Sequence, residues 1–259
     1  MLEKLLCIVK EASLLMGDRN LRIDQKGNDS NYVTSADLAV ERFLDEKLCA
    51  LLPGSKVLGE ENDFADFGCQ YLWVVDPIDG TSNFIRDLGL SAISVGLLKD
   101  GQPYMGVIYH PYRDEIYYAQ KGKGAFLNGR PIRVSDRDFT HSHLCSAMSL
   151  YDKSLAAPCF QVIQEVYYQS DDLRRSGSAA LELAWLAAGR VELYFEIRLF
   201  PWDVAAAAAI IAEAGGFVEF MFHDNMPLAE PFGLIAANTA ENFEKLKGIV
   251  YKHIPEKMY

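Results

Sequence analysis

The amino-acid sequence is poor in several features that identify whole classes of protein. It has five cysteines in 259 residues and no CxxC pair, which argues against a disulfide framework and against a structural zinc site. No apolar run approaches the roughly 20 residues that span a bilayer. The N-terminal segment contains acidic residues and no small-residue cleavage site. We therefore expect a protein of the reducing cytoplasm.

Positive charge is also scarce in this chain. The formal net charge is −11, and no long run of lysine and arginine occurs. Binding to a phosphate backbone or to an anionic membrane is driven largely by cationic side chains, so neither nucleic acid nor membrane is an expected partner. An anionic ligand would need a cation supplied locally.

The first half of the chain predicts two helices followed by short strands. Apolar residues recur at helical spacing in 1–17 and in 35–52, where Thr34 and Ser35 are capping candidates. The strands from residue 90 onward are separated by turn signals and should form an antiparallel meander. The expected strands are 56–59, 71–75, 90–98, 102–110 and 114–120.

The second half alternates between strands and helices. Strands are expected at 143–148, 191–197, 217–222 and 232–238, and helices at 157–169, 178–189, 202–216 and from about Glu241. This order suggests a layered α/β or α+β protein. A soft division near residues 138–142 would separate an N-terminal region, 1–140, from a C-terminal region, 141–259.

Two carboxylates stand where a buried strand runs out, in WVVDPIDGTSNF (73–84). Asp76 and Asp79 lie at the carboxyl end of the predicted strand, where open α/β sheets usually place ligands. Pro77 and Gly80 require the backbone to turn there. Two acids held close repel unless a proton or a cation intervenes, and Mg²⁺ is the simplest relief. The alternative is that Asp-Pro and Asp-Gly are only turn residues.

Other acids occupy comparable positions. Glu60 follows the predicted strand 56–59, in GEEN (59–62), and Asp203 begins a helix beside Trp202. An acid at a helix start is often only a cap, and the same alternative applies to Asp37 in VTSAD (33–37). A helix N-terminus also favours anions, so a phosphate held by metals could share its field.

Several basic side chains and histidines invite a functional interpretation but have a simpler one. Lys26, Arg174 and Arg175 lie in polar segments, where a solvated surface position is the default. His141 and His143 could suggest a metal pair, but a solvated loop is the favoured interpretation.

Together, three segments resemble the inositol monophosphatase family, within a superfamily of Mg²⁺-dependent, lithium-sensitive sugar and nucleotide phosphatases. GEEN, WVVDPIDGTSNF and PWDVAAAAAIIAEAGG (201–216) occur in the family's order and at compatible separations. VTSAD, KGKGAFLNG (121–129) and RRSGSAALELAWLAAG (174–189) extend the match over nearly the whole chain. The resemblance implies a layered α-β-α-β-α sandwich of the inositol monophosphatase and fructose-1,6-bisphosphatase type, usually in a homodimer.

The resemblance also implies a role for each matching residue. Two or three Mg²⁺ ions, or Mn²⁺, would be held by Glu60, Asp76, Asp79, Asp203 and the main-chain carbonyl of Ile78. Glu60 and Thr81 would position the attacking water, with Asp37 orienting Thr81 or the water, and Lys26 would add positive charge. Gly80 and Thr81 would bind the phosphate, and Gly177, Ser178, Ala179 and Glu196 would bind the alcohol part of the substrate.

The substrate remains open between several phosphates. DGTSNF is closer to the inositol-type pattern than to the DGTKEF-like pattern of relatives that act on 3′-phosphoadenosine 5′-phosphate, which favours inositol-1-monophosphate. Arg198, however, falls where inositol-type members commonly have glycine. An arginine two residues after Glu196 could pair with a second phosphate, as in fructose 1,6-bisphosphate, or form a dimer or surface ion pair.

Two non-enzymatic alternatives remain beside a metal-dependent phosphomonoesterase. A regulatory module could keep the same fold, because fold does not fix function. An interaction protein with RNA-linked partners is the other, since some bacterial relatives have such partners. The motif acids are all present, which argues against a decayed site.

Overall fold

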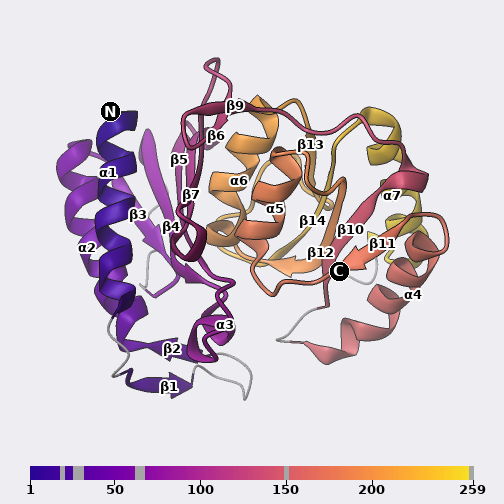
Figure 1. The fold of residues 1–259 in the computed structure, drawn as a ribbon, viewed down its shortest axis with the longest axis horizontal. Coiled ribbons are helices and arrows are strands. Elements are labelled where there is room, and N and C mark those ends of the chain that lie inside the picture. The colour runs from indigo at the N-terminus through magenta and orange to yellow at the C-terminus, as the bar shows by residue number, and fades with distance from the viewer. Residues whose placement is uncertain (18–20, 26–31, 62–67, 149–151, 257–259) are drawn as a thin grey trace.

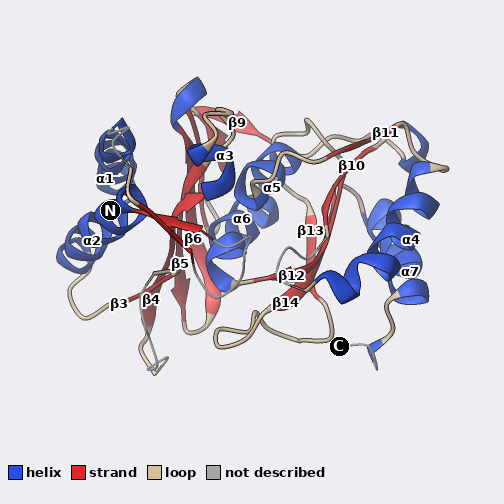
Figure 2. Cartoon of the chain, turned by 90° about the horizontal axis from the view of Figure 1, so that it is seen from below, coloured by secondary structure: helices blue, strands red, loops and turns tan. Residues whose placement is uncertain are grey.

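Two β-sheets alternate with three pairs of helices in the computed structural model, which describes residues 1–17, 21–25, 32–61, 68–148 and 152–256 (Figure 1). Helices α1 (Leu2–Ser13) and α2 (Ser35–Leu51) cover the outer face of the larger sheet. Helices α5 (Ala179–Ala187) and α6 (Pro201–Glu213) lie between the sheets, and α4 (Ala156–Tyr167) and α7 (Ala240–His253) cover the smaller sheet (Figure 2). The α-β-α-β-α layering implied by the resemblance is confirmed.

The larger sheet has seven strands in sequence order, from β3 to β9. Strands β3 and β4 are parallel, and every later pair is antiparallel, so the predicted meander is confirmed. Two short strands at its end, β8 and β9, were not predicted. The strands are β3 (Lys56–Gly59), β4 (Tyr71–Asp79), β5 (Ala92–Lys99), β6 (Gln102–His110), β7 (Glu115–Gln120), β8 (Ala125–Leu127) and β9 (Arg130–Ile132).

The smaller sheet has five strands in the order β11-β10-β12-β14-β13. Strand β10 runs parallel to both of its neighbours, and β14 runs antiparallel to both of its own. Its strands are β10 (His143–Ala147), β11 (Asp172–Arg174), β12 (Leu193–Leu199), β13 (Phe217–Phe220) and β14 (Phe232–Ala237). A separate two-stranded ribbon joins β1 (Ile23–Gln25) to β2 (Tyr32–Thr34).

Helix α6 packs unusually close to the larger sheet because small residues meet there. A Cβ added to Gly106 of β6 would lie 2.1 Å from the carbonyl oxygen of Ala206, and one added to Gly96 of β5 would lie 2.8 Å from Ala205. The alanine run of α6 thus serves close packing as well as helix formation. This packing fixes the start of α6, which carries Asp203, next to the larger sheet.

Most predicted boundaries lie within a few residues of those observed, and the difference that matters for the site is at the end of β4. The strand predicted for 71–75 continues through Pro77 to Asp79, and a short helix, α3 (Thr81–Ile85), follows at once instead of a plain turn. The strand accommodates proline because its ladder with β5 is irregular at that point. Within the described residues, none of the helices is long and apolar enough to span a membrane.

Candidate active site

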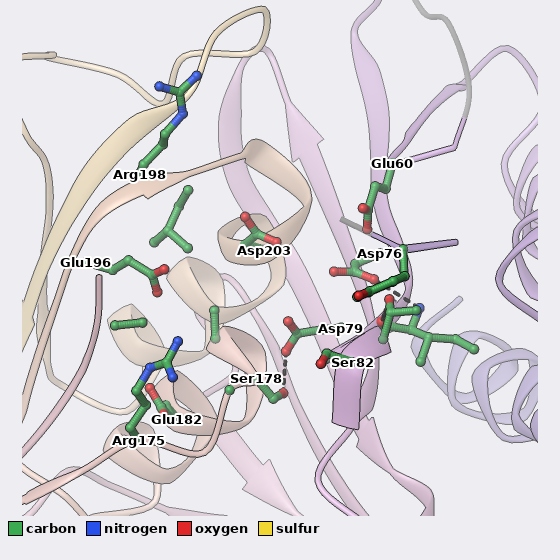
Figure 3. A pocket seen from close by; sticks show the side chains of 18 residues that line it. Glu60, Asp76, Asp79, Ser82, Arg175, Ser178, Glu182, Glu196, Arg198 and Asp203 are labelled. Carbon is green, nitrogen blue, oxygen red and sulfur yellow. Dashed lines mark hydrogen bonds between the residues drawn. The ribbon is translucent and has the colours of Figure 1, made fainter. Parts of the chain in front are cut away.

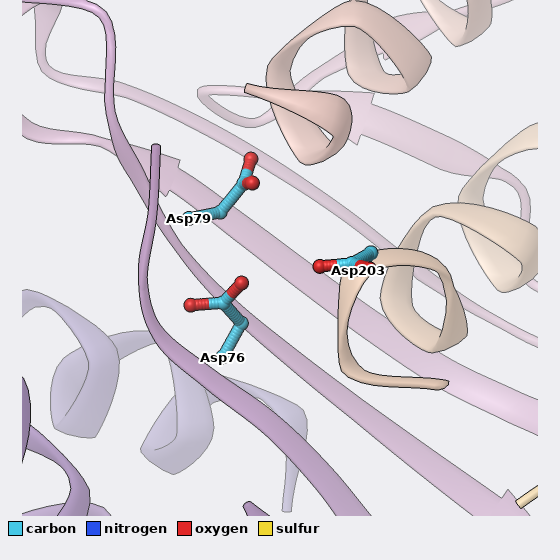
Figure 4. Close-up of side chains that lie close together, drawn as sticks. All are labelled: Asp76, Asp79 and Asp203. Carbon is cyan, nitrogen blue, oxygen red and sulfur yellow. The ribbon is translucent and has the colours of Figure 1, made fainter. Parts of the chain in front are cut away.

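Three aspartates meet between the end of β4 and the start of α6 (Figure 4). Asp76 and Asp79 are among the last residues of β4, and Asp203 lies in the first turn of α6. One carboxylate oxygen from each lies within 4.8 Å of those from the other two. Asp76 and Asp79 are only 2% and 7% exposed, so their carboxylates face one another away from bulk water.

A bulge in β4 brings its two aspartates together. In a regular strand, side chains three residues apart point to opposite faces of the sheet. The register between β4 and β5 shifts between Asp76 and Asp79, where Pro77 has no N–H to donate to the ladder. The Asp76 carboxylate accepts the N–H of Ile78 at 2.9 Å, which fixes this irregular segment.

The carboxylates of Asp79 and Asp203 are held by groups at the starts of two helices. Asp79 accepts the N–H of Ala180 at 2.8 Å and the hydroxyl of Ser178, which is the N-cap of α5. Asp203 accepts the N–H of Phe200, the N-cap residue of α6, at 2.7 Å. Asp203 is therefore a helix-capping residue, as the simpler interpretation had it, and its carboxylate also belongs to the acidic cluster.

Thr81 is held beside the cluster by two acceptors. Gly80 adopts a left-handed backbone, with φ 85°, and ends the strand so that Thr81 begins α3. The Thr81 hydroxyl lies 3.0 Å from the carbonyl oxygen of Ile78 and 3.3 Å from the Asp37 carboxylate. Asp37 is 1% exposed, and its carboxylate also accepts the N–H of Thr34, the residue that precedes α2. The expected contact between Asp37 and Thr81 is thus present.

Glu60 lines the same cavity from the end of β3, with its N–H bonded to the Val75 carbonyl at 3.2 Å. Burial raises the pKa of Asp76 well above its usual range, and the charge of Glu60 raises it further. Burial likewise raises the pKa of Asp79 to about 6 and that of Asp203 well above its usual value, with Asp79 as a second cause there. These carboxylates therefore destabilise one another when all are ionised.

The donor set fits a hard divalent cation. Carboxylate and carbonyl oxygens are the ligands that Mg²⁺ and Mn²⁺ take in proteins, and among the described residues no cysteine or histidine lines this cavity. A bound cation would offset both the burial that raises the pKa values of these aspartates and the repulsion that adds to it at Asp76 and Asp203. The predicted ligands Glu60, Asp76, Ile78, Asp79 and Asp203 all line the cavity.

The cavity continues from the aspartates to α5 and β12 (Figure 3). The residues predicted to bind phosphate or alcohol all line it, namely Gly80, Thr81, Gly177, Ser178, Ala179, Glu196, Arg198 and Asp203. Asp37 does not line it and reaches it through Thr81. The side chains on this part of the wall include both acids and arginines. The part around Asp76, Asp79 and Asp203, where a metal is predicted to bind, is acidic and is named the metal-facing wall.

Two acids and an arginine line the cavity beside α5 and β12, on the wall that is predicted to face the alcohol part of the substrate and is named the alcohol-facing wall. Glu196 accepts the Tyr194 hydroxyl at 2.7 Å, and burial raises its pKa to about 8. Glu182 is 2% exposed and accepts the N–H of Ser176, and burial raises its pKa to about 7. The charge of Arg175 opposes both shifts. Glu182 was missed from the sequence, although a single acid inside the apolar helix 178–189 was a signal for it.

Arg198 lies on the opposite side of Glu196 from Arg175 (Figure 3). It lines the main cavity and also an adjacent surface depression, where its charge lowers the pKa of Asp152 as a minor cause. Its Nε is buried and has no hydrogen-bond partner among the residues that the structure describes. Among the described residues Arg198 makes no ion pair, so the structure gives no direct support to the surface-pair interpretation.

Three candidates from the sequence remain, namely Lys26, His141 and Arg174. Lys26 lies outside the described residues, so its role stays a prediction. His141 is exposed and pairs with Asp138, and Arg174 pairs with Asp172, so neither belongs to the cavity. The surface interpretation of these two residues is confirmed.

Comparison with known proteins gives a consistent result. The family model described as "Inositol monophosphatase family" matches residues 5–255. The Nus factor SuhB of Xylella fastidiosa is 38% identical over 76% of this chain and 72% of that protein. The fructose-1,6-bisphosphatase/inositol-1-monophosphatase of Aquifex aeolicus is 32% identical over 92% of each chain. The crystal structure of the Bartonella henselae suppressor protein suhB superposes with a TM-score of 0.88, at 31% identity over 98% of this chain and 99% of that one.

Proposed function

The chain belongs to the inositol monophosphatase family, and from that premise we propose that it is a Mg²⁺-dependent phosphomonoesterase of sugar or polyol phosphates. We propose inositol-1-monophosphate as its substrate. The observation that carries the proposal is the cluster of Asp76, Asp79 and Asp203, whose carboxylates lie close together, two of them buried, with no cation in contact with them among the described residues. Carboxylates held this close repel one another unless a proton or a cation neutralises them, and a bound cation does so while they stay ionised.

We assign the metal ligands to Glu60, Asp76, Asp79, Asp203 and the carbonyl of Ile78, which line one cavity. When bound there, Mg²⁺ supplies a Lewis acid that lowers the pKa of a water and neutralises the charge of the phosphate. The main-chain N–H groups on Asp76, Asp79 and Asp203 fix the carboxylates before the substrate arrives. This pre-organisation removes a reorganisation cost from the reaction.

Thr81 and Asp37 are assigned to the attacking water. The Thr81 hydroxyl has one proton and two protein acceptors, Ile78 and Asp37, so its proton points to the protein and a lone pair stays available. That lone pair can accept a hydrogen bond from the water and orient it for in-line attack on phosphorus. Asp37 is a positioning residue because it acts through Thr81. No phosphorylated enzyme intermediate is needed.

The phosphate and the alcohol part of the substrate are assigned to other residues that line the cavity. Main-chain N–H groups at Gly80 and Thr81 would bind the phosphate. Glu196 would accept hydrogen bonds from ring hydroxyls, together with the main chain at Gly177–Ala179. The Ser178 hydroxyl already donates to Asp79, so we assign Ser178 a main-chain contact only.

A phosphate-release screen tests the proposal. The panel comprises inositol-1-monophosphate, fructose 1,6-bisphosphate, histidinol phosphate and 3′-phosphoadenosine 5′-phosphate, each with Mg²⁺ and with EDTA. We expect release with Mg²⁺, none with EDTA, and the highest kcat/KM for inositol-1-monophosphate. Undetectable release across the panel would favour a regulatory role for this fold.

Fructose 1,6-bisphosphate is a second candidate substrate because Arg175 and Arg198 flank Glu196 in the cavity. A guanidinium can bind a second phosphate through paired hydrogen bonds. A relative with both activities in its name supports including this substrate. The adenosine bisphosphate is less favoured because of the DGTSNF sequence.

We also propose that the protein acts in the cytoplasm as a homodimer without nucleic-acid or membrane partners. The net charge of −11 supports the absence of direct RNA binding. A relative named as a Nus factor makes a protein partner the alternative. Light scattering after size exclusion tests the dimer, and a pull-down that persists at high salt would support a protein partner.

A further inference from the structure

Helix α2 carries a second buried acid, one turn after Asp37. Glu41 follows Asp37 by four residues, which places the two side chains on the same face of the helix. They are 1% and 4% exposed. Asp37 contacts Thr81, as described above, whereas Glu41 does not line the cavity and has no role in the assignments so far.

The Glu41 carboxylate contacts the main chain directly after Glu60. Its Oε2 accepts the N–H of Glu61 at 2.9 Å. The N–H of Glu60 itself donates to the Val75 carbonyl in β4 at 3.2 Å. Glu41 and β4 therefore hold the two peptide groups on either side of the Glu60 side chain, which restricts the direction in which that side chain leaves the main chain.

Gly59 makes room for this contact. A Cβ built on Gly59 would lie 2.6 Å from the carboxyl carbon of Glu41 and 2.7 Å from each of its oxygens. Such distances are shorter than van der Waals contact, so the carboxylate can lie against the end of β3 only where the strand has no side chain. The sequence at 59–61 and the acid at position 41 thus fit one another.

The position of Glu41 is costly for the fold alone. Val40 and Leu44, its neighbours on α2, are fully buried in the apolar core that joins α2 to the larger sheet. Burying a carboxylate beside such residues is unfavourable without a charge partner. Among the described residues no cation pairs with Glu41, and its hydrogen bond goes to the main chain at Glu61. A leucine would suit the core better.

We propose that Glu41 is a positioning residue for metal binding, which directs the Glu60 carboxylate toward the aspartate cluster by holding the N–H of Glu61. The inference rests on the proposed function, because it takes Glu60 to be a metal ligand. Helix α2 then supports the site twice, through Asp37 and Thr81 at the water position and through Glu41 and Glu61 at the metal position.

Calorimetric titration of the full chain with Mn²⁺ tests this without measuring turnover. Glu41→Leu keeps the approximate volume and removes the acceptor, and we expect Mn²⁺ affinity to fall by about tenfold or more, as is typical when the partner that orients a ligand is lost. Glu41→Gln keeps an acceptor oxygen and should bind Mn²⁺ within about threefold of wild type.

Gly59→Ala is a second variant that leaves Glu41 intact. Its new Cβ meets the flexible end of the Glu41 side chain, so the fold tolerates it while the carboxylate is displaced from Glu61. We expect weaker Mn²⁺ binding here too. The double variant with Glu41→Leu should bind no more weakly than Glu41→Leu alone, because both changes break the same contact. If Glu41→Leu does not fold, the Mn²⁺ affinity of Gly59→Ala is compared with that of Glu41→Gln, and weaker binding by Gly59→Ala supports the inference.

Glu192→Leu is the matched control. Glu192 is 1% exposed and also accepts a main-chain N–H, that of His143 at 2.8 Å, but it lies outside the cavity. This variant should lose stability and keep the Mn²⁺ affinity of its folded fraction. Wild-type affinity in Glu41→Leu and Gly59→Ala, with weaker binding in Glu60→Gln, would overturn the inference and leave the proposed function standing. Absence of Mn²⁺ binding by the wild type would overturn both.

Discussion

The two walls of the cavity are built differently. On the metal-facing wall the acids are mostly short aspartates, and main-chain N–H groups of Ile78, Ala180 and Phe200 hold each one. On the alcohol-facing wall the side chains of Glu182, Glu196 and Arg198 are long, and the buried Nε of Arg198 has no partner within the described part of the chain. A long side chain held by few contacts keeps more rotamer freedom than a short one held by the backbone.

This difference separates reaction from recognition. We expect a change on the metal-facing wall to reduce turnover of every substrate, because it alters the groups that act on phosphorus. A change on the alcohol-facing wall should instead alter the preference among substrates, since it reaches only the part of the substrate that differs between them.

The largest effect is expected for Asp79→Asn. Asparagine keeps the size and one acceptor but removes the charge that a cation requires, so several kcal/mol of transition-state stabilisation are lost, or about 10³-fold in kcat/KM. Phosphate release should fall by this factor for all substrates alike. Asp100→Asn is the control, because Asp100 lies in a turn with φ 50°, which asparagine tolerates. Retained activity in Asp79→Asn would remove the basis of the ligand assignment.

A smaller loss is expected for Thr81→Val. Valine is close to threonine in shape but lacks the hydroxyl that lies against Asp37 and Ile78. We expect kcat to fall by roughly 10²-fold with little change in KM, since the water loses its orientation. Thr81→Ser restores the hydroxyl and should recover most of the rate. Equal losses in both variants would mean that the hydroxyl is not what matters.

The pH dependence of stability distinguishes the two walls without a substrate. The folded-state pKa values of Asp79, about 6, and of Glu182, about 7, are raised by burial, so the folded protein binds more protons than the unfolded chain. The stability that these two groups contribute is therefore largest at low pH and is lost as pH rises through these values, by on the order of 4 kcal/mol between pH 5 and pH 8.

Urea unfolding with EDTA and with Mg²⁺ measures this effect. Mg²⁺ should remove the contribution of Asp79, on the metal-facing wall, and leave that of Glu182. If the free energy of unfolding of the metal-free protein were the same at pH 5 and pH 8, folding would not raise the pKa values of these carboxyls.

The smallest effect, about tenfold, is expected for Arg198→Gly. If Arg198 binds a second phosphate, kcat/KM should fall for fructose 1,6-bisphosphate and not for inositol-1-monophosphate. Arg174→Ala is the control, because Arg174 pairs with Asp172 outside the cavity. Equal loss on both substrates would exclude the second-phosphate role.

Part of this site could be predicted from the sequence. Asp76, Asp79 and Asp203 were identified because three linked motifs contain them, and the layered fold followed from the same resemblance. The short elements were missed. Strands β1 and β11 have three residues each, too few to show a period, and α3 was taken as part of a turn because it starts directly after Gly80.

The contact between Glu41 and Glu61 could not be predicted. The two residues are twenty positions apart, and helical periodicity places position 41 near the apolar face without indicating a partner. Only the packing of α2 against β3 shows that the carboxylate meets a main-chain N–H beside a glycine. Glu182 was missed although its place in an apolar helix was a signal, because the sequence does not indicate its partner, the N–H of Ser176.

The most direct test of the central claim is a crystal structure with Mn²⁺, recorded at the manganese absorption edge. We expect anomalous peaks about 2.0–2.2 Å from carboxylate oxygens of Asp76, Asp79 and Asp203. At least one of these manganese ions should also be ligated by the Glu60 carboxylate. An empty aspartate cluster in crystals that bind Mn²⁺ elsewhere would contradict it.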